Sequence, residues 1–141
     1  FNGYEIEVGR SFTTNNGDFV ISYGRDEVVG TFSSGGNVPR ITPIKNVYRF
    51  ALEQEDVSYN IKVMDIQKED DIGFGESVTD GYTMVNLDIK RTISIGNDEE
   101  LILSVFGRNL LDEKARNHTS YVKNEVPLSG RNFGIKLNFN F

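Results

Sequence analysis

The sequence has no cysteine and no long apolar run, and each absence excludes a class of structure. Without cysteine, the chain has neither a disulfide framework nor a thiolate metal site. Without a long apolar run, it has no transmembrane helix. Strands of a membrane β-barrel escape this test because only every second residue is apolar. A membrane location therefore stays open.

Basic residues and histidine are also scarce. Lys and Arg number 15 against 21 Asp and Glu, which gives a net charge of -6. Nucleic-acid binding needs a basic patch, so the composition excludes that partner. The 1 histidine supports no Ser/His/Asp arrangement, and we expect no enzyme. The chain of 141 residues is one domain or part of one. It starts at Phe1 and lacks a signal peptide, which predicts a removed signal or an internal fragment.

A period of two dominates the residues that are present, most clearly at residues 131–141. Phe, Ile and Leu side chains alternate there with Gly, Lys and Asn, and Phe141 is the last residue. Such a period predicts a strand whose two faces meet different media. In an outer-membrane barrel the apolar face meets lipid, the polar face meets an aqueous lumen, and aromatic residues lie at the interface.

Six further alternating runs precede this strand. We predict strands at residues 1–11, 19–32, 48–53, 57–64, 85–95 and 101–109. Short connections (13–18, 53–56, 96–98) alternate strictly with long ones (33–43, 67–80, 110–130). Outer-membrane barrels show this asymmetry between periplasmic turns and extracellular loops. Arg91 interrupts one apolar face, but close enough to the 96–98 turn for its guanidinium to reach lipid headgroups.

The predicted fold class is all-β, an antiparallel transmembrane β-barrel. Single-chain bacterial barrels have an even number of strands, and an open edge cannot face lipid. Seven predicted strands therefore make residues 1–141 the C-terminal part of a larger barrel. Two alternatives remain open: a soluble all-β sandwich with a binding or adhesion role, and a small porin-like barrel completed by an eighth strand.

Several motifs carry a family resemblance. They are Asn-Leu-Leu-Asp at 109–112, Ala-Arg-Asn-His-Thr-Ser at 115–120 and Pro-Leu-Ser-Gly-Arg-Asn-Phe at 127–133, with Gly-Tyr-Glu-Ile-Glu at 3–7 and Val-Pro-Arg-Ile-Thr-Pro at 38–43. Together they resemble the C-terminus of TonB-dependent outer-membrane receptors over nearly the whole chain. The Arg-Asn-His-Thr-Ser stretch is similar to the branch that includes zinc-uptake receptors, although Ser129 replaces a proline common there.

The resemblance implies a barrel of about 22 strands that is filled by an N-terminal plug and opened through TonB. The function it implies is uptake of a scarce nutrient, either a metal ion such as zinc or an iron chelate or haem. The implied partners are outer-membrane lipid, the remaining barrel and plug, the TonB complex through an upstream segment, and the barrel assembly machinery. The C-terminus would be periplasmic, with Phe139 and Phe141 as the assembly signal.

Two groups of loop residues could bind cations. His118 shares its predicted loop with Asp112, Glu113 and Glu125, and could supply part of a zinc site or could simply pack in the loop. No resident cofactor is expected. The acidic residues of the 67–80 connection could steer cations or be a solvated loop. They are Glu69, Asp70, Asp71, Glu76 and Asp80.

A further set of charged residues falls on the polar parity of the predicted strands. We expect these residues to line the lumen and contact the plug, because a lining of mixed sign suits polar contacts better than conduction of one ion sign. They are Glu5, Glu7, Arg49, Lys62, Asp88, Lys90, Arg108 and Lys136.

Overall fold

A computed structural model describes residues 1–96 and 99–141, and its regular structure is entirely β. The strands are β1 (Asn2–Thr14), β2 (Gly17–Val29), β3 (Lys45–Glu53), β4 (Val57–Ile66), β5 (Tyr82–Ser94), β6 (Glu100–Arg108) and β7 (Asn132–Asn140). No helix in this described part is long and apolar enough to cross a membrane.

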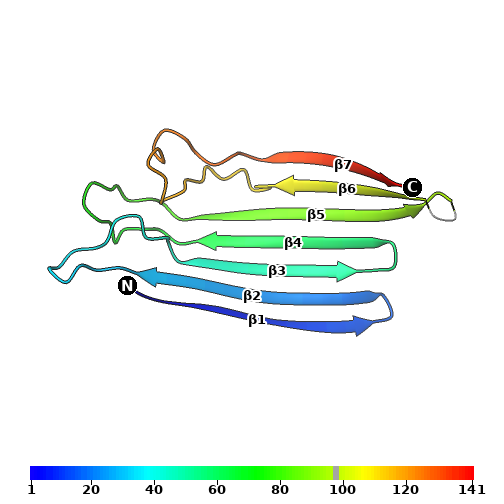
Figure 1. Cartoon of the computed structure of the whole chain (residues 1–141), viewed down its shortest axis with the longest axis horizontal. Coiled ribbons are helices and arrows are strands. Elements are labelled where there is room, and N and C mark those ends of the chain that lie inside the picture. The colour runs from blue at the N-terminus through cyan, green and yellow to red at the C-terminus, as the bar shows by residue number, and fades with distance from the viewer. Residues whose placement is uncertain (97–98) are drawn as a thin grey trace.

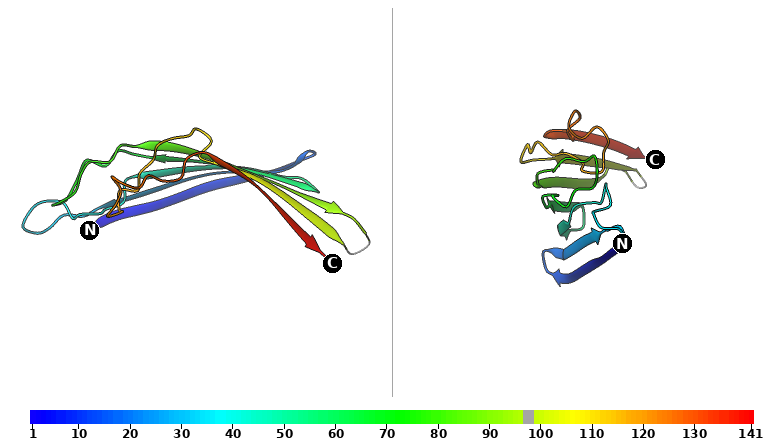
Figure 2. Two further views of the ribbon diagram at one scale, coloured as in Figure 1. Left: turned by 90° about the horizontal axis from the view of Figure 1, so that it is seen from above. Right: turned by 90° about the vertical axis from the view of Figure 1, so that its left-hand side faces the viewer.

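All seven strands form one antiparallel sheet in the order β1-β2-β3-β4-β5-β6-β7, so each strand pairs with its neighbours in sequence (Figure 1). The sheet is a single curved and twisted layer (Figure 2). It is open, because β1 and β7 each pair on one side only. The predicted all-β class, the antiparallel pairing and the seven strands are confirmed. Among the described residues there is neither an eighth strand nor the second sheet that a sandwich requires.

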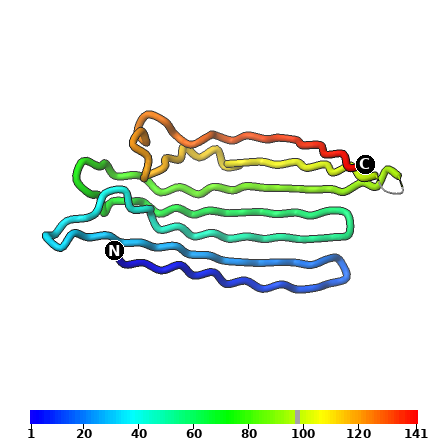
Figure 3. Tube along the Cα trace, in the orientation of Figure 1, coloured from blue at the N-terminus to red at the C-terminus, as the bar shows by residue number. Residues whose placement is uncertain are grey.

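The connections follow the predicted alternation of short and long. The short turns lie at the end of the sheet that carries the C-terminus, and the loops 30–44, 67–81 and 109–131 lie at the other end (Figure 3). The turn predicted at 13–18 was too long, because Thr14 pairs with Gly17 and leaves only residues 15–16 unpaired. Gly17 accommodates the positive φ of 125° next to this turn. Residues 97–98 of the turn predicted at 96–98 lie outside the described residues.

The register of the ladder gathers apolar side chains on one face. Side chains directly opposite each other in paired strands share a face. One such row crosses the whole sheet and is apolar throughout: Phe12, Phe19, Leu52, Tyr59, Ile89, Val105 and Ile135. We call this face of the sheet the apolar band.

The described residues contain no hydrophobic core that covers this band. Val47 and Ala115 are the only buried apolar residues among them, and neither belongs to it. Ile135 is 71% exposed and Leu137 is 64% exposed. Uncovered apolar area of this extent is unfavourable in water. The sheet therefore needs a further apolar medium or partner to bury the band.

The band ends at a polar row near the long loops, which we call the polar ladder. Arg25, Asn46, Asp65 and Thr83 lie in register on the same face as the band. Arg25 Nη1 donates to Asn46 Oδ1 at 3.3 Å, and Asn46 Nδ2 donates to Asp65 Oδ2 at 3.3 Å. Tyr23, the last ring of the band on β2, donates its hydroxyl to Asn46 Oδ1 at 2.9 Å. The apolar surface of β2 to β5 therefore has a defined limit at this end.

Strands β6 and β7 are joined by two reciprocal aromatic–glycine pairs. Phe106 is in register with Gly134, and Gly107 is in register with Phe133. A Cβ atom on Gly134 would lie 2.2 Å from Phe106 Cζ, and one on Gly107 would lie 3.2 Å from Phe133 Cδ1. Each ring therefore covers a glycine on the neighbouring strand, one pair on each face. Aromatic cover of a glycine pins strand register.

We expect Gly134→Val to destabilise the protein by about 1–3 kcal/mol, because the added side chain must displace the Phe106 ring. The urea denaturation midpoint measures this change. Asn138→Val, on the same face of β7, is the matched control and should have a smaller effect. Adding Phe106→Ala to Gly134→Val should recover part of the loss. A double variant no more stable than Gly134→Val would show that the ring does not set the constraint.

Candidate functional site

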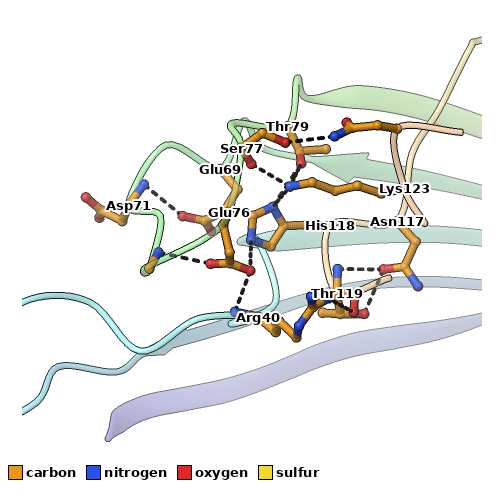
Figure 4. A network of polar contacts seen from close by, with 12 residues as sticks. Arg40, Glu69, Asp71, Glu76, Ser77, Thr79, Asn117, His118, Thr119 and Lys123 are labelled. Carbon is orange, nitrogen blue, oxygen red and sulfur yellow. Dashed lines mark hydrogen bonds and ion pairs between the residues drawn. The ribbon is translucent and has the colours of Figure 1, made fainter. Parts of the chain in front are cut away.

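The three long loops meet in a cluster of buried polar side chains, which we call the loop junction (Figure 4). Arg40 comes from loop 30–44, Glu76 and Thr79 come from loop 67–81, and His118 and Lys123 come from loop 109–131. His118 is 2% exposed and Lys123 is 6% exposed, which is rare for such residues unless they are paired. These side chains therefore join loops that are far apart in the sequence.

Glu76 joins the first two loops. Its Oε1 accepts the backbone N–H of Arg40 at 2.7 Å, and its Oε2 accepts that of Gly73 at 2.9 Å. Burial acts to raise the pKa of this carboxyl. The backbone hydrogen bonds from Gly73 and Arg40 act in the opposite direction, and so do the nearby His118 and Lys123. Together they outweigh burial and hold the pKa of Glu76 below its ordinary value. Glu76 is therefore an anionic bridge between the loops.

His118 and Lys123 join the second and third loops. His118 Nδ1 lies 2.9 Å from Thr79 Oγ1 and 3.2 Å from Lys123 Nζ. Lys123 Nζ also donates to Thr79 Oγ1 at 2.8 Å and to the Ser77 carbonyl oxygen. An ammonium only donates, so Nδ1 is an acceptor and the ring proton belongs on Nε2, 3.6 Å from a carboxylate oxygen of Glu76. Burial is the largest effect that lowers the pKa of His118, and the charge of Lys123 is the second. Glu76 acts in the opposite direction but does not outweigh them, so the neutral ring is favoured.

Arg40 completes the connection between the first and third loops. Its Nη1 donates to the Thr119 carbonyl oxygen at 3.1 Å. Its guanidinium carbon lies 3.3 Å from the centre of the Tyr121 ring, which is a cation–π contact. Arg40 itself has a φ of 64°, an uncommon value for a residue with a side chain. Contacts on both its backbone and its side chain therefore maintain this conformation.

The structure does not place His118 in the metal site considered from the sequence. No group of three or more His, Cys, Asp or Glu suited to a metal is present among the described residues. Both ring nitrogens of His118 face residues of the loop junction. The ammonium of Lys123 lies 3.2 Å from Nδ1, where its positive charge would repel a metal ion. Asp112 instead accepts the backbone N–H of Arg131 at 2.9 Å. In this structure His118 joins loops, and its role as a metal ligand stays a prediction.

Some carboxylates of the 67–81 loop have their partners within the same loop. Asp70 pairs with Lys68 at 2.8 Å, and Glu69 Oε1 accepts the backbone N–H of Asp71 at 3.0 Å. Glu76 is buried in the junction, as described above. These carboxylates therefore do not converge on a common point, and the sequence could not show this because their partners lie in other loops or depend on the loop conformation.

All eight residues expected to line a lumen lie on one face of the sheet, opposite the apolar band. The register places them there: Arg49 is opposite Lys62, for example, and Lys90 and Lys136 both lie opposite Ser104. Arg49 pairs with Glu7 at 3.0 Å, and Arg108 pairs with Asp88 at 2.6 Å. We call this face the polar face. Whether a lumen lies above it is a question of function.

The fold and these two surfaces define the class of protein. It is an open all-β sheet with one apolar face and one polar face, and its long loops are joined to one another at one end. No protein-family model matches the sequence, and no curated protein is significantly similar to it. Function must therefore be inferred from the geometry together with the family resemblance of the motifs.

We expect the loop junction to weaken in acid in two stages. His118 titrates below the ordinary histidine pKa of about 6.5, so the opened loops bind a proton first and stability falls as pH drops below about 6.5. Glu76 titrates below its ordinary value, so a second loss follows below about pH 4.5. Hydrogen exchange of the Arg40 and Gly73 amides, corrected for intrinsic rates, measures both stages.

Glu76→Gln is the control for this titration. It keeps the shape of the side chain but replaces one acceptor oxygen by an NH2 group, so protection should fall at every pH for one of the two amides. It also removes the titratable carboxyl, so the stage below about pH 4.5 should disappear for the other amide. The stage that begins near pH 6.5 should remain, because His118 is still present. Amide protection that is constant from pH 7.5 to 5 would contradict the role assigned to His118.

Proposed function

We propose that the chain is the C-terminal β-barrel segment of a TonB-dependent outer-membrane receptor that takes up a scarce nutrient. The observation that carries this proposal is the single-layer sheet, whose apolar face is exposed along its full width while its other face is polar. Lipid on one side and an aqueous, plug-filled lumen on the other satisfy both faces at once. The choice of family rests on the resemblance of the C-terminal motifs.

The height of the apolar band fits this proposal. Gly17, next to the first short turn, and Arg25 of the polar ladder lie about eight residues apart on β2. At about 3.4 Å per residue and a tilt of about 40°, they are separated by about 21 Å across the bilayer. Outer-membrane barrels have apolar bands about 25 Å tall. Arg91 supports the same limits, since it lies opposite Val57, the first residue after a short turn, where its charge can reach headgroups.

The open edges fit a larger barrel. Unpaired N–H and C=O groups on β1 and β7 cannot face lipid, so further strands must pair with them. In the family arrangement of about 22 strands, the remainder of the barrel supplies these strands. The short turns and the C-terminus then lie in the periplasm, and the loop junction lies at the extracellular mouth. There it would hold three loops in one arrangement around the entrance.

The cargo in this proposal is a metal ion or a metal chelate, as the resemblance implies. The described loops contain no cluster suited to a bare metal ion. Cargo contacts in the proposed receptor would then come from the plug, from other loops, or from recognition of the chelating molecule rather than the metal. The TonB complex would act through the upstream segment.

An added charge in the middle of the apolar band should block membrane assembly, whereas the same charge one residue away should not. The band already contains one arginine in the row of Ile61, Arg10 on the edge strand β1, whose guanidinium carbon lies 4.9 Å from the centre of the Phe12 ring. Ile61 belongs to the band and Asn60 to the polar face of β4. Ile61→Arg should cost about 2–4 kcal/mol near the bilayer midplane, and Asn60→Arg should be tolerated. The measurement is the fraction of full-length receptor in the outer membrane that shifts in electrophoretic mobility on boiling. Equal fractions for the two variants would overturn the assignment of the faces.

Deleting Phe141 should slow insertion far more than it destabilises inserted protein. Phe141 follows the end of β7, is 96% exposed and lies 5.9 Å from Phe139 between ring centres. Losing one such side chain removes about 1.5–3 kcal/mol of burial at most, too little to unfold a large barrel. Recognition by the assembly machinery would be affected directly. Insertion yield and the denaturation midpoint of inserted receptor separate these effects, and normal yield with a lowered midpoint would make Phe141 a packing residue.

A further inference from the structure

The chain contains two Asn-Gly pairs, Asn2-Gly3 and Asn16-Gly17, and the fold places them in different surroundings. Asn2 and Gly3 both lie in β1 and are paired with β2. Asn16 is one of the two unpaired residues in the turn between β1 and β2 (Figure 1). An Asn-Gly pair is chemically reactive, because glycine has no side chain to shield an amide nitrogen that can attack the neighbouring carboxamide. The structure decides which of the two pairs can react.

The strand keeps Asn2 from reacting. Ring closure requires the asparagine backbone to rotate until the next amide nitrogen reaches the side-chain carboxamide. Between paired residues of a ladder this rotation breaks backbone hydrogen bonds, so it occurs only when the strand opens locally. Gly3 is also packed against β2, since a Cβ atom there would lie 2.6 Å from the Glu27 carbonyl oxygen. The fold therefore protects the first Asn-Gly pair.

The turn leaves the side chain of Asn16 available. Asn16 is exposed, and the turn borders an open hollow of about 710 Å³. Two side chains of the described residues hydrogen-bond Asn16, and both contact its main chain. Thr14 Oγ1 accepts the Asn16 N–H at 3.1 Å, and Gln54 Nε2 donates to the Asn16 carbonyl oxygen at 2.8 Å. The carboxamide can therefore rotate toward the Gly17 nitrogen while both of these hydrogen bonds remain.

Gln54, in the short turn between β3 and β4, also favours the chemistry. The reaction begins when a base removes the Gly17 amide proton. The negative charge of the resulting peptide anion lies largely on the Asn16 carbonyl oxygen, which is the atom that accepts the hydrogen bond from Gln54. A hydrogen bond becomes stronger when its acceptor is charged. Gln54 therefore stabilises the reactive anion.

We infer that Asn16 is a site of spontaneous deamidation through a succinimide. The Gly17 nitrogen attacks Asn16 Cγ and forms a carbon–nitrogen bond, and the side-chain nitrogen leaves as ammonia. Water then opens the ring at one of its two carbonyl carbons. Cleavage of the bond from the Gly17 nitrogen to Cγ gives aspartate, and cleavage of the bond to the main-chain carbonyl carbon gives isoaspartate. The overall reaction consumes one water and releases one ammonia.

The modification weakens the turn in two ways. Isoaspartate adds one methylene group to the main chain, and the length of a hairpin loop fixes the register of its strands. The new carboxylate also joins Asp18, Glu53 and Glu55 around the same hollow, where like charges repel. Both effects act on the β1-β2 hairpin, whatever medium or partner covers the sheet. The inference therefore does not depend on the proposed function.

The test incubates folded full-length protein at neutral pH and physiological temperature and follows both Asn-Gly pairs by peptide mass spectrometry. Asn16 should convert at least about tenfold faster than Asn2, because only Asn2 must wait for its strand to open. In protein unfolded in urea the two sites should react at similar rates, since the dipeptides are identical. Isoaspartate should exceed aspartate at position 16, as a succinimide requires. Asn16→Gln is the matched control and should stay unmodified.

A second variant tests the role of Gln54. Gln54→Met keeps the length of the side chain but cannot donate a hydrogen bond, so it should slow conversion of Asn16 about three- to tenfold. Faster conversion would show that Gln54 protects the turn, which contradicts the role assigned to it.

The remaining outcomes separate this inference from the proposed function. No conversion of Asn16 in the folded protein, or equal rates at Asn16 and Asn2, would overturn the inference. Aspartate without isoaspartate would overturn the succinimide route. A protein that does not reach the outer membrane would overturn the proposed function and leave this comparison unaffected, because the comparison needs only the folded β1-β2 hairpin.

Discussion

Every surface of this protein depends on the register of one antiparallel ladder. Because side chains alternate at each residue, a slip of one position in any strand would exchange its apolar and polar sides. The row from Phe12 to Ile135 stays apolar across the sheet only in the observed register. Short turns set this register at one end of each hairpin, and the reciprocal pairs of Phe106 with Gly134 and Phe133 with Gly107 set it for the terminal strand.

The long loops are organised by a different interaction, a network of buried charge. The strands hold the loop ends at one edge of the sheet, but their contacts do not determine how the loops fold. Glu76, His118 and Lys123 do this through hydrogen bonds between loops that are distant in sequence. Buried charges are stable only when paired and hydrogen-bonded, so such a network tolerates few alternative arrangements. In the proposed receptor, this network would hold the loops at the mouth in one arrangement.

The apolar band and the polar face place complementary demands on the surroundings. The band requires an apolar medium or an apolar partner, and the polar ladder of Arg25, Asn46 and Asp65 marks where the apolar surface ends on β2 to β4. The polar face requires water or a polar partner. Within a bilayer the open edges would require further strands. A segment of a larger barrel around a plug meets all of these demands together, and this agreement supports the proposed function.

The sequence by itself determined the all-β class, the seven strands, the alternation of turns and loops, and the face on which each of the eight charged residues lies. These features follow from local periodicity, since a period of two is readable along one strand. Only the tertiary structure decided strand ends such as Thr14, the contacts between the three long loops, and the hydrogen bonds of His118. Those depend on which strands and loops become neighbours: Lys123 meets Thr79 across 44 positions of sequence. No spacing rule encodes such a contact, because it arises only after the ladder has brought the loops together.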